Sequence, residues 1–282
     1  MNQAELIPAL EQELLEATRP PARFVERARR YAPAIVLFIA ALLLWEGVVA
    51  AFNIQGFLLP RPTVIARTFA SELSVIFPAG LFTMREAVGG FFIGSILGAL
   101  AALATARWTT VNQGLMPFAI AVNSTPIVAL APIMNNWFGI TNPLAKMSIV
   151  GVIVFFPVMI NMVRGLTQVD AGALELMRSY AAREFTVLRR VRIPNAMPFL
   201  FSALKVASTL SVIGAIVSEY FGGSREALGV YISQQAALFH FAQAWAAIII
   251  ACLMGIGFYV VILAVERLVM PWHVSLRATD ES

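Results

Sequence analysis

Residues 167–196 read TQVDAGALELMRSYAAREFTVLRRVRIPNA, a polar segment that separates two long apolar runs. The segment carries charges of both signs, and it is too long for a simple connection between neighbouring helices. We interpret it as a helical hairpin that projects from a membrane into the cytoplasm, where another protein can bind it. The alternative, which charge and length alone leave open, is an ordinary solvated connector.

The composition of the chain is that of a membrane protein. Its 282 residues are 59% hydrophobic and 13% charged, with a mean hydropathy of +0.79, whereas a soluble domain carries about 25% charged residues. The basic pI of about 9.6 comes from arginines that cluster beside apolar runs, which is the positive-inside pattern and not a groove for phosphates. We therefore expect a lipid bilayer as a partner and no nucleic acid.

Six apolar segments are long enough to cross a bilayer as helices. They cover residues 32–52, 84–106, 115–136, 145–165, 198–220 and 242–265. The expected fold class is an all-α membrane protein, and the distribution of arginine predicts that both termini are cytoplasmic. The expected domains are a cytoplasmic N-terminal segment (1–30), a transmembrane domain (31–270) that includes the polar hairpin, and a cytoplasmic tail (271–282).

A repeat of small residues in the second apolar segment predicts close helix packing. Gly90, Gly94 and Gly98 recur every four residues, and such a face lets two helix backbones approach each other. The partner helix belongs either to the same chain, which is the default, or to a second copy.

The third and fifth apolar segments contain the residues of a candidate solute path. Prolines interrupt the third segment, which also holds Asn123, Ser124 and Thr125, and the fifth segment holds Ser211 and Glu219. Interrupted helices are tolerated in a membrane where they line a cavity or pack on protein. The alternative is a kinked structural helix whose polar groups satisfy one another.

The spacing within residues 167–196 resembles the cytoplasmic signature loop of permease subunits in binding-protein-dependent ABC importers. That pattern is Glu-Ala-Ala, three residues, Gly, nine residues, Ile, one residue and Leu-Pro. Glu175 takes the glutamate position, Ala181 the glycine position, Val191 the isoleucine position and Ile193–Pro194 the Leu-Pro position. The departures are alanine for glycine at Ala181, and Leu176 and Met177 for the two alanines. Val191 and Ile193 are milder, apolar-for-apolar changes.

Three further stretches are similar to permeases of the nitrate, sulfonate and taurine importers and of their relatives for thiamine-pyrimidine precursors and riboflavin. They are FLLPRPTVI (57–65), ALAPIMNNWFGI (129–140) and SEYFGGSREALGVYI (218–232). Together with the signature loop, the resemblance extends over about residues 35 to 270. It implies a type I ABC importer permease in the bacterial inner membrane.

The resemblance also implies a set of partners and a docking site. The expected partners are a dimer of ATPase subunits that holds ATP and Mg, a second permease copy in a homodimer, and an extracytoplasmic solute-binding protein. The cargo expected is a small organic or inorganic anion, such as a sulfonate or nitrate, or a vitamin or pyrimidine precursor such as riboflavin. The residues expected to contact the ATPase are Glu175, Met177, Arg178, Ala181, Arg183, Val191, Ile193 and Pro194.

The sequence contains no motif that would supply energy for transport. Neither Lys146 nor Lys205 follows a glycine, so the sequence lacks a phosphate-binding G-x-x-x-x-G-K-[ST] loop. The only histidines are His240 and His273, which are too few for a metal centre of the usual kind. We predict no catalytic residue, no metal and no cofactor in this chain, and therefore no enzyme activity.

Two other classes of membrane protein compete with this interpretation. An ion-coupled secondary transporter needs carboxylates within the membrane, for which we single out Glu46 and Glu219, although both can also lie near an interface. A membrane-embedded enzyme needs a cluster of nucleophile, base or metal ligands, and the sequence displays none.

Overall fold

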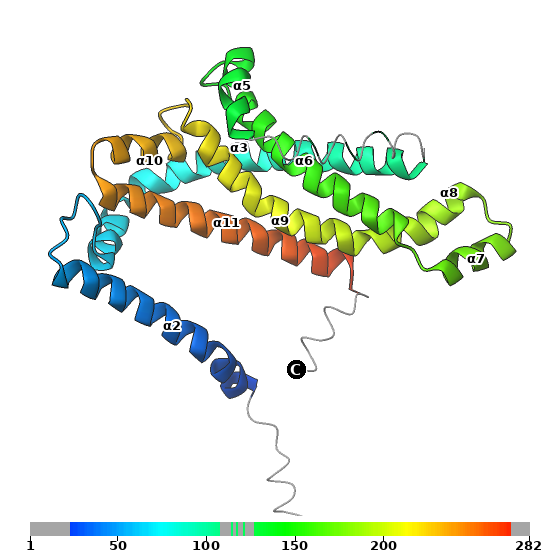
Figure 1. Cartoon of the computed structure of the whole chain (residues 1–282), viewed down its shortest axis with the longest axis horizontal. Helices are drawn as coiled ribbons and strands as arrows, with labels where there is room; N and C mark the ends of the chain where they lie inside the picture. Colours follow the sequence, from blue (N-terminus) through cyan, green and yellow to red (C-terminus); the bar gives the residue numbers. More distant parts are fainter. Residues whose placement is uncertain (1–22, 108–113, 115–116, 118–120, 122–126, 272–282) are drawn as a thin grey trace, which may run out of the picture. The chain divides into compact units, whose positions relative to one another are not determined.

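The computed structural model describes residues 23–107, 114, 117, 121 and 127–271, which are mainly helical (Figure 1). The long helices are α2 (Arg23–Ala51), α3 (Pro62–Arg107), α6 (Pro143–Thr167), α9 (Ile193–Glu219) and α11 (Phe241–Val269). The shorter ones are η1 (Ile127–Leu130), α5 (Ala131–Phe138), α7 (Ala171–Ser179), α8 (Glu184–Val187), the π-helical turn η2 (Leu188–Arg192) and α10 (Leu228–Ala237). The predicted all-α class is confirmed.

Five helices of the described part are long and apolar enough to cross a membrane. The first and the last three correspond to the predicted segments 32–52, 145–165, 198–220 and 242–265. The predicted start of the second segment at residue 84 is wrong, because α3 already begins at Pro62. Pro78 lies inside α3, and a proline removes one hydrogen bond without ending the helix when its surroundings support it.

Several predictions fall on residues that the structure does not describe. The predicted third span, 115–136, is described as a continuous stretch only from residue 127, where η1 and α5 begin. Most of the N-terminal segment, 1–22, and most of the C-terminal tail, 272–282, also lie outside the described residues.

The described residues up to Thr63 form a compact unit of their own, which contains α2. The carboxylate of Glu46 accepts hydrogen bonds from the backbone N–H of Thr63 at 3.1 Å and from its hydroxyl at 2.9 Å. The first turn of a helix has N–H groups without intrahelical partners, and Thr63 lies in the first turn of α3. Glu46 therefore caps this turn with a negative charge, which the helix dipole favours.

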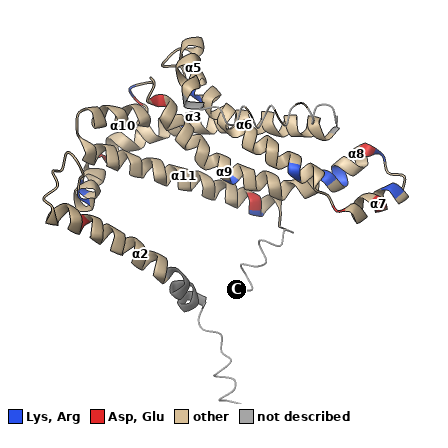
Figure 2. Ribbon diagram, in the orientation of Figure 1, with Lys and Arg blue, Asp and Glu red and all other residues tan. Residues whose placement is uncertain are grey.

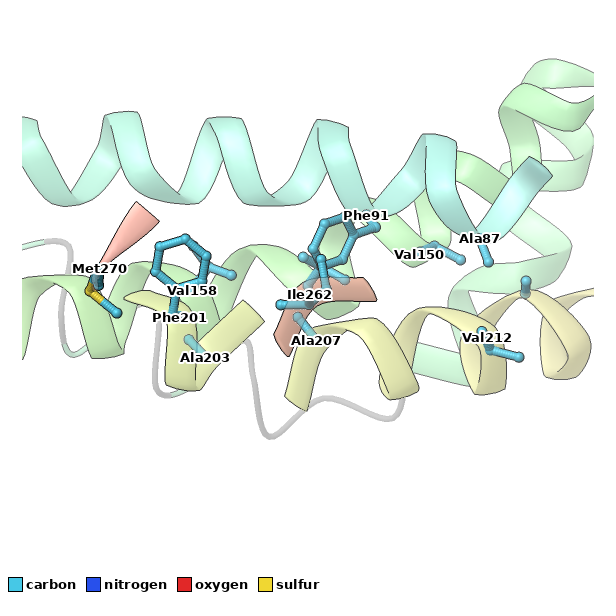
Figure 3. Packing of buried hydrophobic residues seen from close by; sticks show 12 residues of the cluster. Ala87, Phe91, Val150, Val158, Phe201, Ala203, Ala207, Val212, Ile262 and Met270 are labelled. Carbon is cyan, nitrogen blue, oxygen red and sulfur yellow. The ribbon is translucent and has the colours of Figure 1, made fainter. Parts of the chain in front are cut away.

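The second unit, which comprises the described residues from Val64 onward, is built on the long contact between α6 and α9. Its largest core joins four helices, as Figure 3 shows: Phe91 of α3, Val150 and Val158 of α6, Phe201 of α9 and Ile262 of α11. The rings of Phe91 and Phe258 meet edge to face with their centroids 4.9 Å apart, a favoured aromatic geometry. These contacts fix α3 and α11 against the α6–α9 pair.

The predicted small-residue face of α3 packs against α6 of the same chain. A Cβ atom added at Gly94 would lie 2.3 Å from the carbonyl oxygen of Gly151, and one added at Gly98 would lie 2.7 Å from that of Phe155. A Cβ atom added at Gly90 would lie 2.4 Å from the Cβ atom of Val150. The intrachain interpretation is confirmed, because only residues without a side chain allow this approach of two backbones.

An ion pair joins α9 to α11 in the same unit. The Nζ atom of Lys205 lies 2.8 Å from Oε2 and 3.0 Å from Oε1 of Glu266, and Glu266 is largely buried. A charge within an apolar helix is tolerated when a partner of opposite charge is at hand. The pair therefore explains how two charged residues fit between membrane-crossing helices.

Candidate functional site

The hairpin between α6 and α9 consists of two short helices, as predicted. The carboxylate of Asp170 caps α7 by accepting a hydrogen bond from the N–H of Ala173 at 2.9 Å. The α8 helix follows after a short turn and continues through η2 into α9, so that residues 184–219 form one helical stretch. Figure 1 shows α7 and α8 extending beyond the ends of α6 and α9.

The turn after α7 places Ala181 in a left-handed backbone conformation, with φ at +49°. The N–H of Ala182 donates to the carbonyl of Met177 at 3.0 Å, and the N–H of Ala181 donates to that of Arg178 at 2.9 Å. This pair of bonds is the Schellman motif, whose left-handed position is usually glycine. The turn thus explains why the importer pattern has glycine where this chain has alanine.

The outer surface of the hairpin carries exposed charges and exposed aromatic rings. Figure 2 shows Lys, Arg, Asp and Glu gathered on α7, α8 and the segment that joins α8 to α9, whereas the long helices are mostly uncharged. Tyr180 is 74% exposed and Phe185 is 71% exposed, and Leu176 is exposed beside them. Large exposed apolar side chains on a polar loop indicate a protein-binding surface.

The predicted docking residues fall into two groups in the structure. The first group is exposed at the tip of the hairpin and comprises Glu175, Arg178, Ala181 and Arg183, with Met177 half-buried beside them. The second group lies where η2 joins α9 and comprises Val191, Ile193 and Pro194; of these, Ile193 packs on the core between α6 and α9. Sequence reasoning did not single out Tyr180 and Phe185, although aromatic residues on a polar loop are a recognisable signal.

The base of the hairpin is a tight crossing of α6 and α9. A Cβ atom at Gly165 would lie 2.6 Å from the Cα atom of Ala196, which is buried. The two helices therefore touch backbone to backbone at this point. This contact fixes the base of the hairpin, because the hairpin connects the ends of these two helices.

The predicted solute path is only partly within the described residues. Asn123, Ser124 and Thr125 lie outside them. Ser211 is fully buried, and its hydroxyl donates to the carbonyl of Ser208 in its own helix at 2.7 Å. Glu219 is also buried, at the end of α9, where it takes part in a polar cluster.

The polar cluster, by which we mean Thr83, Glu86, Lys146 and Glu219, is enclosed between α3, α6, α9 and α10. Oε1 of Glu219 accepts a hydrogen bond from the hydroxyl of Thr83 at 2.7 Å, and its Oε2 accepts one from the N–H of Gly229 at 2.7 Å. The hydroxyl of Thr83 in turn accepts from the N–H of Leu228 at 2.9 Å. Glu219 and Thr83 together cap the N-terminus of α10.

Lys146 connects this cluster to a polar cavity. Its Nζ atom donates to Oδ1 of Asn135 at 2.8 Å and to the carbonyl of Ile140. The side-chain amide of Asn135 donates to the carbonyl of Phe221 at 3.1 Å. These bonds hold α5 and the loop after α9 beside the start of α6.

The cavity has a volume of about 530 Å³ and is lined by Pro132, Asn135, Asn136, Gly139, Ile140, Thr141 and Phe221. Its lining provides amides, a hydroxyl and an aromatic ring, and none of these residues carries a formal charge. None of the predicted path residues is among them.

Sequence reasoning missed Glu86 and Lys146 as members of a site. Glu86 is 3% exposed and Lys146 is 1% exposed, and both stand in apolar segments, where a charged residue favours a functional role. That signal was available in the sequence for both residues. What the sequence does not contain is their proximity to Glu219, because these residues are far apart along the chain.

Comparison with known proteins agrees with this arrangement. Residues 72–272, which include the hairpin and the polar cluster, match the family described as the binding-protein-dependent transport system inner membrane component. The chain belongs to that family. It is an ABC importer permease, a multi-pass protein of the bacterial inner membrane.

The relatives of this permease have several transport assignments. The riboflavin transport system permease protein RibX of Chloroflexus aurantiacus is 29% identical over 94% of this chain and 100% of its own length. The formylaminopyrimidine transport permease protein ThiX of Halalkalibacterium halodurans is 28% identical over 84% of this chain and 94% of its own. The putative aliphatic sulfonates transport permease protein SsuC of Bacillus subtilis is 26% identical over 86% of each chain.

A solved structure shares the fold of this permease. The crystal structure of an amino acid ABC transporter with histidines aligns with a TM-score of 0.56 over 70% of this chain and 95% of the solved chain. The sequence identity is 19%, so the similarity concerns the fold alone. The type I importer fold expected from the sequence is consistent with it.

Proposed function

We propose that this permease forms the membrane path of an importer whose energy comes from a separate ATPase subunit. The observation that carries the proposal is the hairpin, which exposes Tyr180 at the end of α7 and Phe185 on α8, beyond the close contact of its base at Gly165. Exposed aromatic residues dominate the binding energy of many protein interfaces. The ATPase partner would supply ATP and Mg, since this chain has no phosphate-binding loop.

The complete importer that we propose contains two copies of this chain, two ATPase subunits and an extracytoplasmic binding protein. ATP binding would bring the ATPase subunits together and displace the hairpins. Because the hairpin is attached to both α6 and α9, a displacement at its tip reaches both helices. The binding protein would deliver the solute to the opposite side.

For the cargo, we propose an uncharged heterocyclic vitamin or vitamin precursor, in the class of riboflavin or a formylated aminopyrimidine. Two of the relatives carry transport names of this class. The polar cavity supports the same choice, because its lining provides amides, the hydroxyl of Thr141 and the ring of Phe221. A sulfonate site would be expected to present an arginine or lysine, and the charge of nearby Lys146 is already directed at Asn135 and Ile140.

Co-purification tests the assembly. We expect this chain, co-expressed with the correct ATPase, to elute as a two-to-two complex that hydrolyses ATP. Glu175→Lys should weaken that complex, because it reverses an exposed charge on α7. Glu226→Lys is the matched control, since it makes the same reversal at an exposed position in the loop between α9 and α10. Equal complex formation by both variants would remove the hairpin as the docking site.

Uptake into proteoliposomes tests the cargo. With the ATPase inside and the binding protein outside, we expect ATP-dependent accumulation of labelled riboflavin or formylaminopyrimidine and none of taurine. Accumulation of the sulfonate alone would overturn the cargo assignment while leaving the permease role intact. Uptake that follows an ion gradient without the ATPase would instead favour a secondary transporter.

A further inference from the structure

The polar cluster contains two carboxyl groups that have different surroundings. Glu219 faces donors on both of its oxygens: the hydroxyl of Thr83 on Oε1 and the N–H of Gly229 on Oε2. A backbone N–H can only donate, and the Thr83 hydroxyl, which accepts from the N–H of Leu228, donates its own hydrogen to Glu219. The arrangement therefore needs Glu219 as a hydrogen-bond acceptor, which is the ionised form.

Glu86 has the opposite surroundings. Its Oε2 atom is buried and has no hydrogen-bond partner among the residues that the structure describes. An unpaired carbonyl oxygen of a neutral acid costs much less to bury than an unpaired oxygen of a carboxylate. The burial of Glu86 on α3 is thus compatible with a proton-bearing acid and poorly compatible with an ion.

The two carboxyl groups also contact each other. The side chains of Glu86 and Glu219 are close enough to interact with each other. Two ionised carboxylates have no proton to share and repel each other, so a contact of this kind requires one proton between them. Because both oxygens of Glu219 act as acceptors, the proton belongs to Glu86, which donates it.

The charges around the two glutamates balance when Glu86 is protonated and Glu219 is ionised. Lys146 on α6 is close enough to interact with both carboxyl groups, and its positive charge offsets the single negative charge of Glu219. Arg85 also acts on Glu86, but its side chain is exposed on α3. Burial and the charge of Glu219 raise the pKa of Tyr220, so this phenol stays neutral and adds no charge.

We propose that Glu86 is a protonated positioning residue that holds the ionised carboxylate of Glu219 on the N-terminus of α10. The two glutamates then have separate tasks. Glu219 binds the N–H of Gly229 and the hydroxyl of Thr83, whereas Glu86 orients Glu219 and neutralises the repulsion that a second carboxylate would cause. For the transport cycle, and here the inference rests on the proposed function, the middle of α3, the end of α9 and the start of α10 would move as one body.

Amide hydrogen exchange of the full chain in nanodiscs tests the proposal without any partner. Glu86→Gln keeps a neutral donor of the same shape, so the exchange of the Leu228 and Gly229 amides should stay within about twofold of wild type. Glu219→Gln removes the acceptor charge and should speed both amides about tenfold or more, since bonds to charged groups are the strong ones. Equal acceleration in Glu86→Gln, or none in Glu219→Gln, would overturn the proposal.

A second pair of variants covers the case in which Glu219→Gln does not fold. Thr83→Ser keeps the bridging hydroxyl and should leave the two amides protected, whereas Thr83→Val removes it and should expose Leu228 first. Protection that is the same in both variants would overturn the capping role of Thr83 and Glu219.

The proton itself has a spectroscopic signature. A carboxylic acid gives an infrared C=O band that a carboxylate lacks, and the band shifts in heavy water. We expect the difference spectrum between wild type and Glu86→Gln to contain this band. If it is absent there, or is lost only in Glu219→Gln, the proton is not on Glu86 and the assignment of roles fails.

Discussion

The side-chain amide of Asn195, in the first turn of α9, donates to the backbone carbonyl of Gly165 near the end of α6 at 2.8 Å. It also donates to the carbonyl of Gln168 at 2.9 Å. Gly165 lies in the last turn of α6 and Gln168 directly follows that helix. Carbonyls at these positions have no hydrogen-bond donor within the helix. One side chain of α9 therefore closes the end of α6, at the base of the hairpin.

Replacing Asn195 should loosen this base. We expect Asn195→Ala to lower the free energy of unfolding by about 1–3 kcal/mol, because two hydrogen bonds are lost. Asn195→Asp should be at least as harmful, since a carboxylate cannot donate to the carbonyls. Thermal unfolding in detergent measures the change, and ATP hydrolysis per solute transported should rise in the assembled importer.

Asn161 provides the matched control for Asn195. Among the described residues its amide donates within α6, to the carbonyl of Pro157 at 2.8 Å, and not to another helix. Asn161→Ala should cost about 1 kcal/mol or less and leave the ratio of hydrolysis to transport unchanged. An equal effect of both substitutions on that ratio would argue against a special role of Asn195.

The left-handed turn at Ala181 predicts a stabilising substitution. Ala181→Gly should raise the free energy of unfolding by about 1 kcal/mol, because glycine adopts a positive φ without the steric cost that alanine incurs. Ala173→Gly, within α7, is the control and should lower it by about 0.5–1 kcal/mol. Chemical denaturation of the full chain measures both, and a loss of stability in Ala181→Gly would contradict the geometry of the turn.

The exposed rings of the hairpin should contribute to ATPase binding. We expect Tyr180→Ala and Phe185→Ala each to weaken the complex by about tenfold or more, as truncation of an aromatic hot spot does. Their unfolding temperature should change little, because both side chains are mostly exposed. Trp137→Ala is the control, since Trp137 is equally exposed but lies on α5. The affinity of each variant for the purified ATPase tests this prediction. Unchanged binding in both hairpin variants would exclude the two rings as binding anchors.

The contact between α3 and α6 should not accept a side chain at Gly94. The added methyl group of Gly94→Ala would meet the carbonyl oxygen of Gly151, and the helices would have to separate, at a cost of about 1–3 kcal/mol. Gly257→Ala on α11 is the control, because no atom of the part of the chain that the structure describes lies within 4 Å of its Cβ position, and it should be neutral or stabilising. Comparable loss in both variants, measured by thermal unfolding, would show that the close approach is unimportant.

The sequence predicts the helices of this permease well because they are set by local patterns. Long apolar runs bounded by charges locate α2, α6, α9 and α11, and the arginine-rich segment locates the hairpin. The extension of α3 back to Pro62 is not predicted, since that part also contains Glu72 and Pro78. Whether such residues end a helix depends on the packing around them, which a single sequence does not display.

The polar cluster shows where prediction from sequence stops. Thr83 and Glu219 are separated by 136 residues and their contact depends on how α3 and α9 pack. Burial of Glu219 can be inferred from its place in an apolar segment, but its partners cannot. The turn at Ala181 is an intermediate case, because the importer pattern marks that position as glycine and only the structure gives the reason.

The π-helical turn η2 has a consequence for the angular relation between the two ends of residues 184–219. Each α-helical residue advances the direction of the side chains by about 100°, and a π-helical turn accommodates an extra residue in that count. The turn therefore sets the rotational phase between the hairpin and Glu219. Deleting one residue from Leu188–Arg192 would preserve a continuous helix, yet it would rotate the hairpin by about a quarter of a turn relative to the glutamate.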